Sequence, residues 1–449
     1  MDASPTPATE AALAAAESKT NLRRTAWAGI IGSVVEYFDF TLFGLAAATV
    51  LGPLFFPQSD PATQTIQALL TAAIGYLGRP IGGILFSHLG DRMGRKPMLV
   101  ITVILMGVAT VAIGLLPTYA QIGIWAPILL AACRILQGMG AGAEYVGSLA
   151  MMAESGDRRS YGLRVSLPGM GVFGGIVLAT AVFALISLLP REDLLSWGWR
   201  VPFIASIVTV GVGLWIRTGI HETAEFTEAK GRGTLEELPV LSAIRKQWRE
   251  ILIGFGINGP YLAFSSLTQV YILSYLTVIL HYPASFGLLA NLVSSTIAMG
   301  TVPLAGYLGD VIGRRYVWLF GCAVFIVFGL VAFPLFATGS EPLIILAMIL
   351  GISIGLASMY ATQGALLTAL FDAEHRISGV VLVREPTAAI IAGPVPAFAT
   401  TLVVNANGAT WPVSTLFIVA SVVAAGTALI AWRRLGEHAR DSHELRDDA

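Results

Sequence analysis

Apolar stretches of roughly 20 residues recur along the whole chain, and they limit its possible folds more than any other feature. A helix of that length is just long enough to cross the hydrocarbon core of a bilayer. Hydrophobic residues fill 55% of the 449 positions and charged residues only 12%, so a soluble protein of this composition would expose far too much apolar surface. The sequence therefore predicts an all-α integral membrane protein and argues against an enzyme of the soluble classes.

About twelve transmembrane segments can be placed, in two groups of six. The first group covers 26–51, 65–89, 97–116, 125–153, 163–189 and 199–218, and the second covers 250–280, 285–308, 316–337, 342–370, 378–403 and 412–432. We accordingly expect a tail at 1–25, a six-helix bundle at 26–218, a linker at 219–249, a second six-helix bundle at 250–432 and a tail at 433–449. The polar linker and the tails are the parts expected outside the membrane.

Lysine and arginine are unevenly distributed over the connections between these segments. The connections near 52–64, 117–124, 281–285, 338–341 and 404–411 contain neither residue. The loop at 190–198, which is expected on the same side of the membrane as these connections, contains only Arg191. The other loops and both tails contain nearly all the rest, and loops rich in these residues stay on the cytoplasmic side. We therefore expect a multi-pass protein of a cell membrane with both termini and the linker in the cytoplasm. Residues 1–20 lack the features of a cleaved signal peptide.

One loop sequence occurs twice. Residues 90–96 have the sequence Gly-Asp-Arg-Met-Gly-Arg-Lys, and residues 309–315 have Gly-Asp-Val-Ile-Gly-Arg-Arg, 219 positions later. A repeat at about half the chain length predicts two copies of one membrane unit in the same orientation, related by an axis along the membrane normal.

With its flanking residues, the first copy resembles the signature loop of the major facilitator superfamily of secondary transporters. The sequences Arg-Pro-Ile-Gly-Gly at 79–83 and His-Leu-Gly-Asp-Arg-Met-Gly-Arg-Lys at 88–96 resemble the metabolite:proton symporter branch, as does Trp-Gly-Trp-Arg-Val-Pro-Phe at 197–203. That branch includes permeases for alpha-ketoglutarate, shikimate, citrate and proline or betaine. Ser87 departs from the pattern, because the family usually has a glycine there.

The resemblance implies a secondary active transporter that works by alternating access, as a monomer in a bacterial plasma or inner membrane. We expect symport of a small organic metabolite, a carboxylate, together with protons. A proton-driven efflux antiporter is the nearer alternative, and a transporter-like membrane sensor is the more distant one. Symport is favoured because residues 168–175 lack the ordered Gly-Pro-x-x-Gly-Gly of the superfamily's antiporters.

No cofactor, metal ion or nucleic-acid partner is expected. Cys133 and Cys322 lie far apart in apolar segments, the sequence offers no metal-ligand spacing, and the net charge is only −1. The expected partners are the metabolite, protons and the lipid bilayer.

Ionisable residues inside membrane segments are costly, so they usually face a partner, a cavity or water. Glu36 and Asp39 are three positions apart in the first segment and therefore share a helical face, where two carboxylates would favour a shared proton. They are our candidates for proton coupling, with Glu144 in the fourth segment as the next. The alternative is that the two acids only neutralise Arg79 or Arg134.

Arginines in two segments suggest an anionic substrate. Arg134 opens a motif similar to the superfamily's Arg-x-x-x-Gly, and Arg384 lies about two turns into the eleventh segment, where the branch resemblance weakens. We predict that these two residues clamp a carboxylate across a central cavity, with Glu385 orienting the arginine or responding to protons. A local salt bridge remains the alternative for each. Further candidate substrate-binding residues are polar or aromatic: Tyr37, Asn258, Tyr261, Gln269, Tyr360 and Gln363.

The two loop aspartates have a different expected role. The family resemblance implies that Asp91 caps the N terminus of a helix in the opposite half and so holds the cytoplasmic face shut, drawing on the helix dipole. Asp310 should do the mirrored job. The whole predicted gating set is Asp91, Arg92, Gly94, Arg95, Asp310 and Arg314. The second copy has Val311 in place of an arginine, which predicts a weaker latch there.

Overall fold

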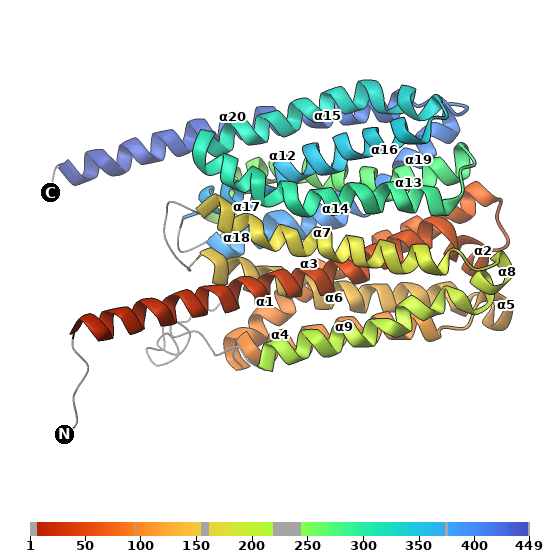
Figure 1. Ribbon diagram of the computed structural model, residues 1–449, viewed down its shortest axis with the longest axis horizontal. Helices are drawn as coiled ribbons and strands as arrows, with labels where there is room; N and C mark the ends of the chain where they lie inside the picture. Colours follow the sequence, from red (N-terminus) through yellow and green to blue (C-terminus); the bar gives the residue numbers. More distant parts are fainter. Residues whose placement is uncertain (1–6, 94, 154–160, 219–243, 373–375, 448–449) are drawn as a thin grey trace.

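The computed structural model of the chain describes residues 7–93, 95–153, 161–218, 244–372 and 376–447. These residues are helical apart from short connections, and no strand occurs among them. The long helices run roughly along the long axis of the molecule (Figure 1). Helix α1 begins and α20 ends at the same end, on the left of Figure 1, which we name the terminal end; the other is the far end.

The helices before residue 219 form the first half of the molecule. Its long helices are α1 (Pro7–Thr49), α3 (Pro61–Met93), α4 (Arg95–Leu115), α6 (Trp125–Ala153), α7 (Tyr161–Ile186) and α9 (Arg200–Thr218). The short elements between them are α2 (Leu51–Phe55), α5 (Tyr119–Ile122), α8 (Arg191–Asp193) and the π-helical turn η2 (Leu194–Gly198).

The helices after residue 243 form the second half, where several spans contain π-helical turns. The first three spans are α12 (Trp248–Ser266) continued by η3 (Leu267–Tyr271), α13 (Ile272–Ser274) and η4 (Tyr275–Ile279); α14 (Ala284–Leu308) continued by η5 (Gly309–Gly313); and α15 (Arg314–Ala337). The last three are α16 (Glu341–Met348) continued by η6 (Ile349–Leu356) and α17 (Ala357–Ala369); α18 (Arg376–Thr387) with η7 (Ala388–Ala392) and α19 (Val395–Asn405); and α20 (Trp411–Asp447).

These segments agree with the predicted fold. Eight described segments are long and apolar enough to cross a membrane, one of which, Ala284–Ala337, contains both α14 and α15, and the bent pair Arg191–Gly198 and Arg200–Trp215 adds a ninth. Counted from loop to loop, the helices of the described ranges make twelve spans, six in each half. The chain is an all-α, multi-pass membrane protein. Residues 219–243, most of the predicted linker, lie outside the described ranges, so the domain boundaries stay a prediction.

The structure differs from the predicted spans at both ends of the chain. The first predicted span begins at residue 26, whereas α1 begins at Pro7, and the last predicted span ends at 432, whereas α20 continues to Asp447. The added residues of α1 are rich in alanine, the best helix former, so the helix continues past its apolar part. Hydropathy marks where a span is apolar, and helix propensity decides how far the helix extends beyond it.

Each half has its own packed interior. In the second half, the rings of Phe264 and Phe325 stack with centroids 4.0 Å apart, and Phe417 stacks on Phe264 at 5.8 Å. In the first half, Trp199 packs edge-on against Phe55 and Phe203. The helices of the two halves occupy separate layers in Figure 1, with α7, α14 and α18 near the boundary.

Two helix pairs form the main contact between the halves. Helix α7 packs along α14, and α3 packs along α18, η7 and α19. Glycines allow both approaches: a Cβ on Gly306 would come within 2.9 Å of the Gly162 carbonyl oxygen, and a Cβ on Gly393 within 3.0 Å of the Ala73 Cα. Small residues at such contacts let helix backbones touch within a membrane.

The position of α3 is set by a second row of glycines. A Cβ on Gly78 or Gly82 would overlap a backbone carbonyl of α6, and a Cβ on Gly142 of α6 would overlap the Arg79 carbonyl oxygen. The backbones of α3 and α6 are therefore in direct contact. This contact fixes the part of α3 that carries Arg79 at the boundary between the halves.

Candidate functional site

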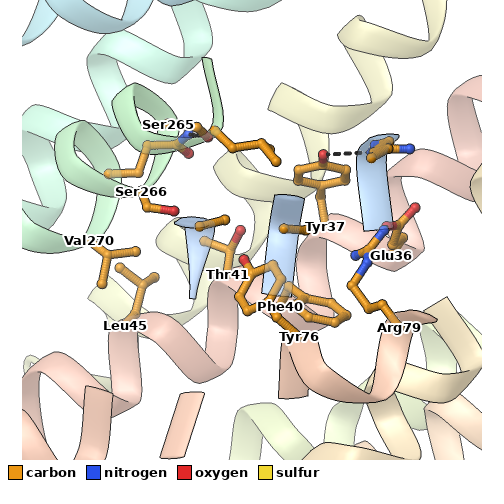
Figure 2. A pocket seen from close by; sticks show the side chains of 15 residues that line it. Glu36, Tyr37, Phe40, Thr41, Leu45, Tyr76, Arg79, Ser265, Ser266 and Val270 are labelled. Atoms are coloured by element: carbon orange, nitrogen blue, oxygen red, sulfur yellow. Dashed lines mark hydrogen bonds and ion pairs between the residues drawn. The ribbon is translucent and has the colours of Figure 1, made fainter. Parts of the chain in front are cut away.

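A cavity lies between the halves and contains about 730 Å3 of empty space, its opening included. Two helices from each half form its wall, at Glu36, Tyr37, Phe40, Thr41 and Leu45 of α1, Tyr76 and Arg79 of α3, Leu262, Ser265, Ser266, Gln269 and Val270 of α12 and η3, and Arg384, Ala388 and Ala392 of α18 and η7. Figure 2 shows Glu36, Tyr37 and Arg79 on one side and Ser265, Ser266 and Val270 on the other.

An ion triad forms the charged side of the cavity. The Nη2 of Arg79 lies 2.9 Å from Glu36 Oε1, and its Nε donates a hydrogen bond to Glu385 Oε2 at 2.7 Å. The three residues are only 5%, 3% and 1% exposed. Because buried charges are tolerated only with close partners, one guanidinium holding two carboxylates is the arrangement that permits this burial. The triad also joins the halves, since Glu385 belongs to α18 and the other two residues to the first half.

The second arginine of the cavity, Arg384, also contacts the first half. Its Nη2 lies 3.3 Å from the Tyr37 hydroxyl, the bond drawn as a dashed line in Figure 2. Adjacent residues of a helix point in different directions, so Arg384 lines the cavity while Glu385 lies behind it against Arg79. Arg384 is thus on the cavity wall, and its role in substrate binding stays a prediction.

The opposite wall is polar but uncharged. Gln269 Nε2 donates to Ser265 Oγ at 2.9 Å, and Asn291 Nδ2 donates to the Gln269 carbonyl oxygen at 3.3 Å. Both second-half walls include π-helical turns, which frequently occur at functional sites: Gln269 lies on η3 and Ala388 on η7. A ligand in the cavity would therefore meet charge on one side, and hydroxyl and amide groups on the other.

Arg134 is a correction to the predicted site. It does not line the cavity; its Nη2 donates to the Ala72 carbonyl oxygen at 3.0 Å, and its guanidinium lies 4.9 Å from the Phe40 ring centroid and 4.1 Å from that of Phe43. The reason is Gly75, whose missing side chain leaves the space that the guanidinium fills. The predicted clamp of Arg134 with Arg384 is therefore not formed, and Arg79 occupies the place expected for Arg134.

The first-segment acids also differ from the predicted arrangement. Asp39 Oδ2 accepts a hydrogen bond of 2.9 Å from the Thr110 hydroxyl on α4, and Thr110 in turn accepts one of 2.7 Å from Gln137. Glu36 instead pairs with Arg79 on α3, so the two carboxylates bond to different helices and do not meet at one proton site. Asp39 lies inside the first half, away from the cavity wall. Its role in proton coupling stays a prediction.

Four predicted substrate-binding residues of the second half lie off the cavity wall. Gln363 Nε2 donates to Asn258 Oδ1 at 2.6 Å, and the Tyr261 and Tyr360 rings pack with centroids 5.9 Å apart. They link α12 to α17, and although Tyr261 directly precedes the wall residue Leu262, its ring points to Tyr360. Of the predicted substrate-binding residues, Tyr37, Gln269 and Arg384 line the cavity, and Glu385 reaches it through Arg79.

At the terminal end, Asp310 joins the two halves. Its Oδ1 accepts a hydrogen bond from the Gly162 N–H at 2.8 Å, and its Oδ2 accepts one from the Leu163 N–H at 2.9 Å. These donors belong to the first turn of α7, where N–H groups have no partner within the helix and a negative charge is favoured. Arg314 adds an ion pair of 3.1 Å to Oδ1.

The turn that carries Asp310 depends on one glycine. Gly313 has φ of 103°, a conformation that side chains disfavour, and it ends η5 where α15 begins. Its counterpart Gly94 lies outside the described residues, as do the side chains of Asp91, Arg92, Arg95 and Glu144. The roles assigned to these five residues stay predictions.

Arg79 is the site residue to which the sequence assigned no place in the cavity. A signal for it was available in the sequence: Arg79 is a charged residue next to a proline inside an apolar helix. Pro80 removes a backbone hydrogen bond of α3 and so makes the helix irregular at that turn. The same signal recurs in α18, where Pro386 follows Glu385. Charge and helix irregularity together mark both sides of the interface that forms the triad.

Comparison with known proteins decides the family. The family model described as Major Facilitator Superfamily matches residues 29–393. The chain belongs to this superfamily. It is therefore a membrane transporter of small molecules, in a family and among relatives that are transporters rather than enzymes.

Curated relatives cover most of this transporter. The inner membrane metabolite transport protein YhjE of Escherichia coli is 39% identical over 361 residues, 78% of this chain and 81% of its own. The shikimate transporter of Escherichia coli is 33% identical over 92% of this chain and 95% of its own, and the proline/betaine transporter of Salmonella typhimurium is 34% identical over 89% and 82%. These relatives confirm the expected metabolite transporter branch.

Solved structures support the fold alone. The proton:xylose symporter XylE, bound to 6-bromo-6-deoxy-D-glucose, superposes with a TM-score of 0.73 at 14% identity, covering 93% of this transporter and 96% of that chain. A partially occluded, inward-open form of XylE from E. coli gives 0.69 at 16% identity over 92% and 98%. Two bundles of six helices are thus the architecture of this transporter.

Proposed function

We propose that this transporter imports a small organic acid together with protons, by alternating access of the cavity between its halves. The observation that carries the proposal is the position of two arginines, Arg79 and Arg384, at one cavity wall beside the acids Glu36 and Glu385. A metabolite without charge would need no such wall, because buried charges are costly to maintain in a membrane.

The arginines support a carboxylate as the recognised group. A guanidinium binds a carboxylate through two parallel hydrogen bonds, and a protein cavity excludes the water that would compete. Arg384 donates a hydrogen bond to the Tyr37 hydroxyl at the cavity wall, where a carboxylate would be a stronger acceptor. Shikimate, proline and betaine, which appear in the names of two relatives, each contain one carboxylate.

The acids support proton coupling. Glu36 and Glu385 are buried at the same wall as the arginines, so adding a proton to either changes the charge that a substrate meets. The Asp310 joint supports alternating access, because its hydrogen bonds tie the two halves together at the terminal end, apart from the cavity wall. With the lysines and arginines of the loops on the inner side, both termini lie in the cytoplasm of a bacterial cell whose plasma or inner membrane holds the protein.

Uptake into proteoliposomes tests the proposal. Purified protein is reconstituted, an inward proton gradient is imposed, and accumulation of labelled shikimate, alpha-ketoglutarate, citrate, proline and glycine betaine is measured with and without a protonophore. We expect one acid to accumulate above its outside concentration, and the protonophore to abolish the accumulation. Faster uptake under an outward gradient would indicate the antiporter, and no transport of any of the five would overturn the proposal.

A further inference from the structure

We propose that Glu385 takes up the coupled proton, and that its protonation transfers Arg79 from Glu385 to the carboxylate of the substrate. This inference rests on the proposed function and names its coupling residue. Glu385 then takes the proton-coupling role for which the sequence favoured Glu36 and Asp39. The reasons are in the geometry of the triad.

The two acids of the triad are not equivalent. Glu36 and Arg79 both belong to the first half, so a rigid movement of one half against the other leaves their contact of 2.9 Å intact. The hydrogen bond of 2.7 Å between Arg79 and Glu385 instead connects α3 to α18, across the boundary. Protonation of Glu385 removes one partner of an ion pair that crosses between the halves at the level of the cavity.

The unbonded oxygen of Glu385 is also placed to accept a proton. Its Oε1 is buried and has no hydrogen-bond partner among the residues that the structure describes. Donors to a carboxylate stabilise its charged form, so an oxygen without a donor is where protonation costs least. Arg79 holds the other oxygen, Oε2, and releases it when the carboxylate becomes neutral.

Charge balance couples this proton to an anion. A substrate carboxylate that binds Arg79 adds one negative charge to the buried cluster of Arg79, Glu36 and Glu385. A buried charge that nothing offsets is costly. One carboxylate together with one proton on Glu385 leaves the net charge of this cluster unchanged.

Other titratable groups surround this part of α18. On helices packed against it or bonded to it they are Glu36, Tyr37 and Asp39 of α1, Tyr76 and Arg79 of α3, Cys133 and Arg134 of α6, Arg249, Glu250 and Tyr261 of α12, and Tyr360 of α17; the side chains of His88, Asp91 and Arg92 of α3, Glu144 of α6 and Arg376 of α18 lie outside the described residues. Among the described ones, Glu385 and Glu36 are the acids in contact with Arg79.

A proton from water on the outer side adds to Glu385, giving a neutral carboxylic acid, and the Arg79–Glu385 ion pair breaks. The substrate carboxylate takes its place on Arg79 Nε and also reaches Arg384. After the halves turn, the substrate and the proton leave to water on the inner side, and the original ion pair forms again. One proton moves with each substrate carboxylate, and no other reactant is needed.

The first experiment measures the tie between the halves without a substrate. Spin labels are attached at Gln58→Cys and Ala409→Cys, two exposed positions on loops of different halves, in a Cys133→Ala and Cys322→Ala background. We expect the distance distribution to lengthen as the pH falls through the Glu385 transition, because the tie exists only while Glu385 is ionised. Glu385→Gln should show the long population at every pH, and Glu385→Asp should keep a pH response.

The matched control is Glu250→Gln. Glu250 pairs with Arg434 at 2.9 Å within the second half, away from the cavity, so its loss should leave the wild-type pH response unchanged. A wild-type distance that ignores pH would overturn the proposal, as would a Glu385→Gln variant that still responds. Should Glu385→Gln fail to fold, loss of the pH response in Glu385→Asp would also contradict it.

The second experiment measures coupling. With shikimate as the probe, the wild-type affinity should fall about tenfold per pH unit above the Glu385 transition, since one proton is linked to binding. Glu385→Gln should bind with no such slope and exchange shikimate across the membrane, yet fail to accumulate it under a proton gradient. If the wild type accumulates an acid and Glu385→Gln does so equally well, Glu385 is not the coupling residue. If the wild type accumulates none, the proposed function fails, while the label distances still decide whether Glu385 ties the halves.

Discussion

The two arginines of the cavity contact different groups. Arg79 pairs with two carboxylates, and Arg384 donates a hydrogen bond to the Tyr37 hydroxyl. A substrate carboxylate that replaces this phenol at Arg384 leaves both ion pairs of Arg79 intact. Arg384 is therefore the first contact that we expect for the substrate, and Arg79 the second.

Arg384→Gln should weaken binding of the transported acid by about 10- to 100-fold, which corresponds to about 1.5–3 kcal/mol for a hydrogen bond to a charged group. The protein level in the membrane should not change. Equilibrium binding to the purified variant measures the effect, and Arg434→Gln is the control because Arg434 pairs with Glu250 outside the cavity. Normal carboxylate binding by Arg384→Gln would make this arginine structural.

The polar network around Asp39 leads to a different prediction. Thr110 donates to Asp39 and accepts from Gln137 in the interior of the first half. Thr110→Val should lower the free energy of unfolding by about 1–3 kcal/mol, because buried polar groups lose their partner. Thermal unfolding in detergent measures this loss.

Asp39→Asn separates the structural interpretation of Asp39 from a coupling role. We expect the variant to unfold at a lower temperature while its transport keeps the wild-type pH dependence, since Asp39 lies off the cavity wall. Transport that no longer depends on pH, in a variant that is folded and inserted, would return the coupling role to Asp39 and argue against Glu385.

At the scale of helices, backbone contact between α3 and α6 determines where Arg79 lies. Gly82→Ala would place a Cβ against the Met139 backbone, and the two helices would have to move apart. Overpacking of this kind costs about 1–3 kcal/mol, so the variant should unfold at a lower temperature and lose uptake.

The matched control for this contact is Gly300→Ala in α14, where a Cβ would meet nothing within 4 Å. Alanine is the better helix former, so this variant should be at least as stable as the wild type. Equal thermal unfolding of the Gly82→Ala and Gly300→Ala proteins would show that the α3–α6 contact is looser than the structure indicates.

For the whole molecule, the balance between its open and closed states depends on the Asp310 joint. Asp310→Asn removes the negative charge that accepts hydrogen bonds from two N–H groups of α7 and forms an ion pair with Arg314. Loss of a helix cap costs about 1–2 kcal/mol, so the closed terminal end should become about 5- to 30-fold less favoured. Labelling of single cysteines at the terminal end, compared between this variant and Glu250→Gln, measures the shift. Unchanged labelling would show that Asp310 does not hold that end shut.

The family resemblance implies the same latch at Asp91, whose side chain lies outside the described residues. Asp91→Asn should leave folding and membrane insertion intact but reduce transport, because the helices keep their apolar spans while the latch loses its charge. A folded, inserted variant that transports at the wild-type rate would contradict this gating role.

The sequence by itself determined the fold and the family. Membrane segments are long and uniformly apolar, because the bilayer has no water to satisfy backbone groups, so hydropathy marked all twelve spans. The repeated loop and the flanking motifs identified the superfamily because each motif is a contiguous stretch of the chain. Helix ends, as in α1 and α20, were less exact, because propensity continues where hydropathy stops.

Only the tertiary structure decided which charges meet. The partners Arg79 and Glu385 are 306 positions apart, and their contact depends on the packing of α3 against α6 and α18. Arg134 has the same charge and a similar apolar setting, yet Gly75 and two phenylalanines hold it away from the cavity. The chemical type of a buried residue is written in the sequence, but its partner is set by side-chain volume and helix register, which exist only in the packed molecule.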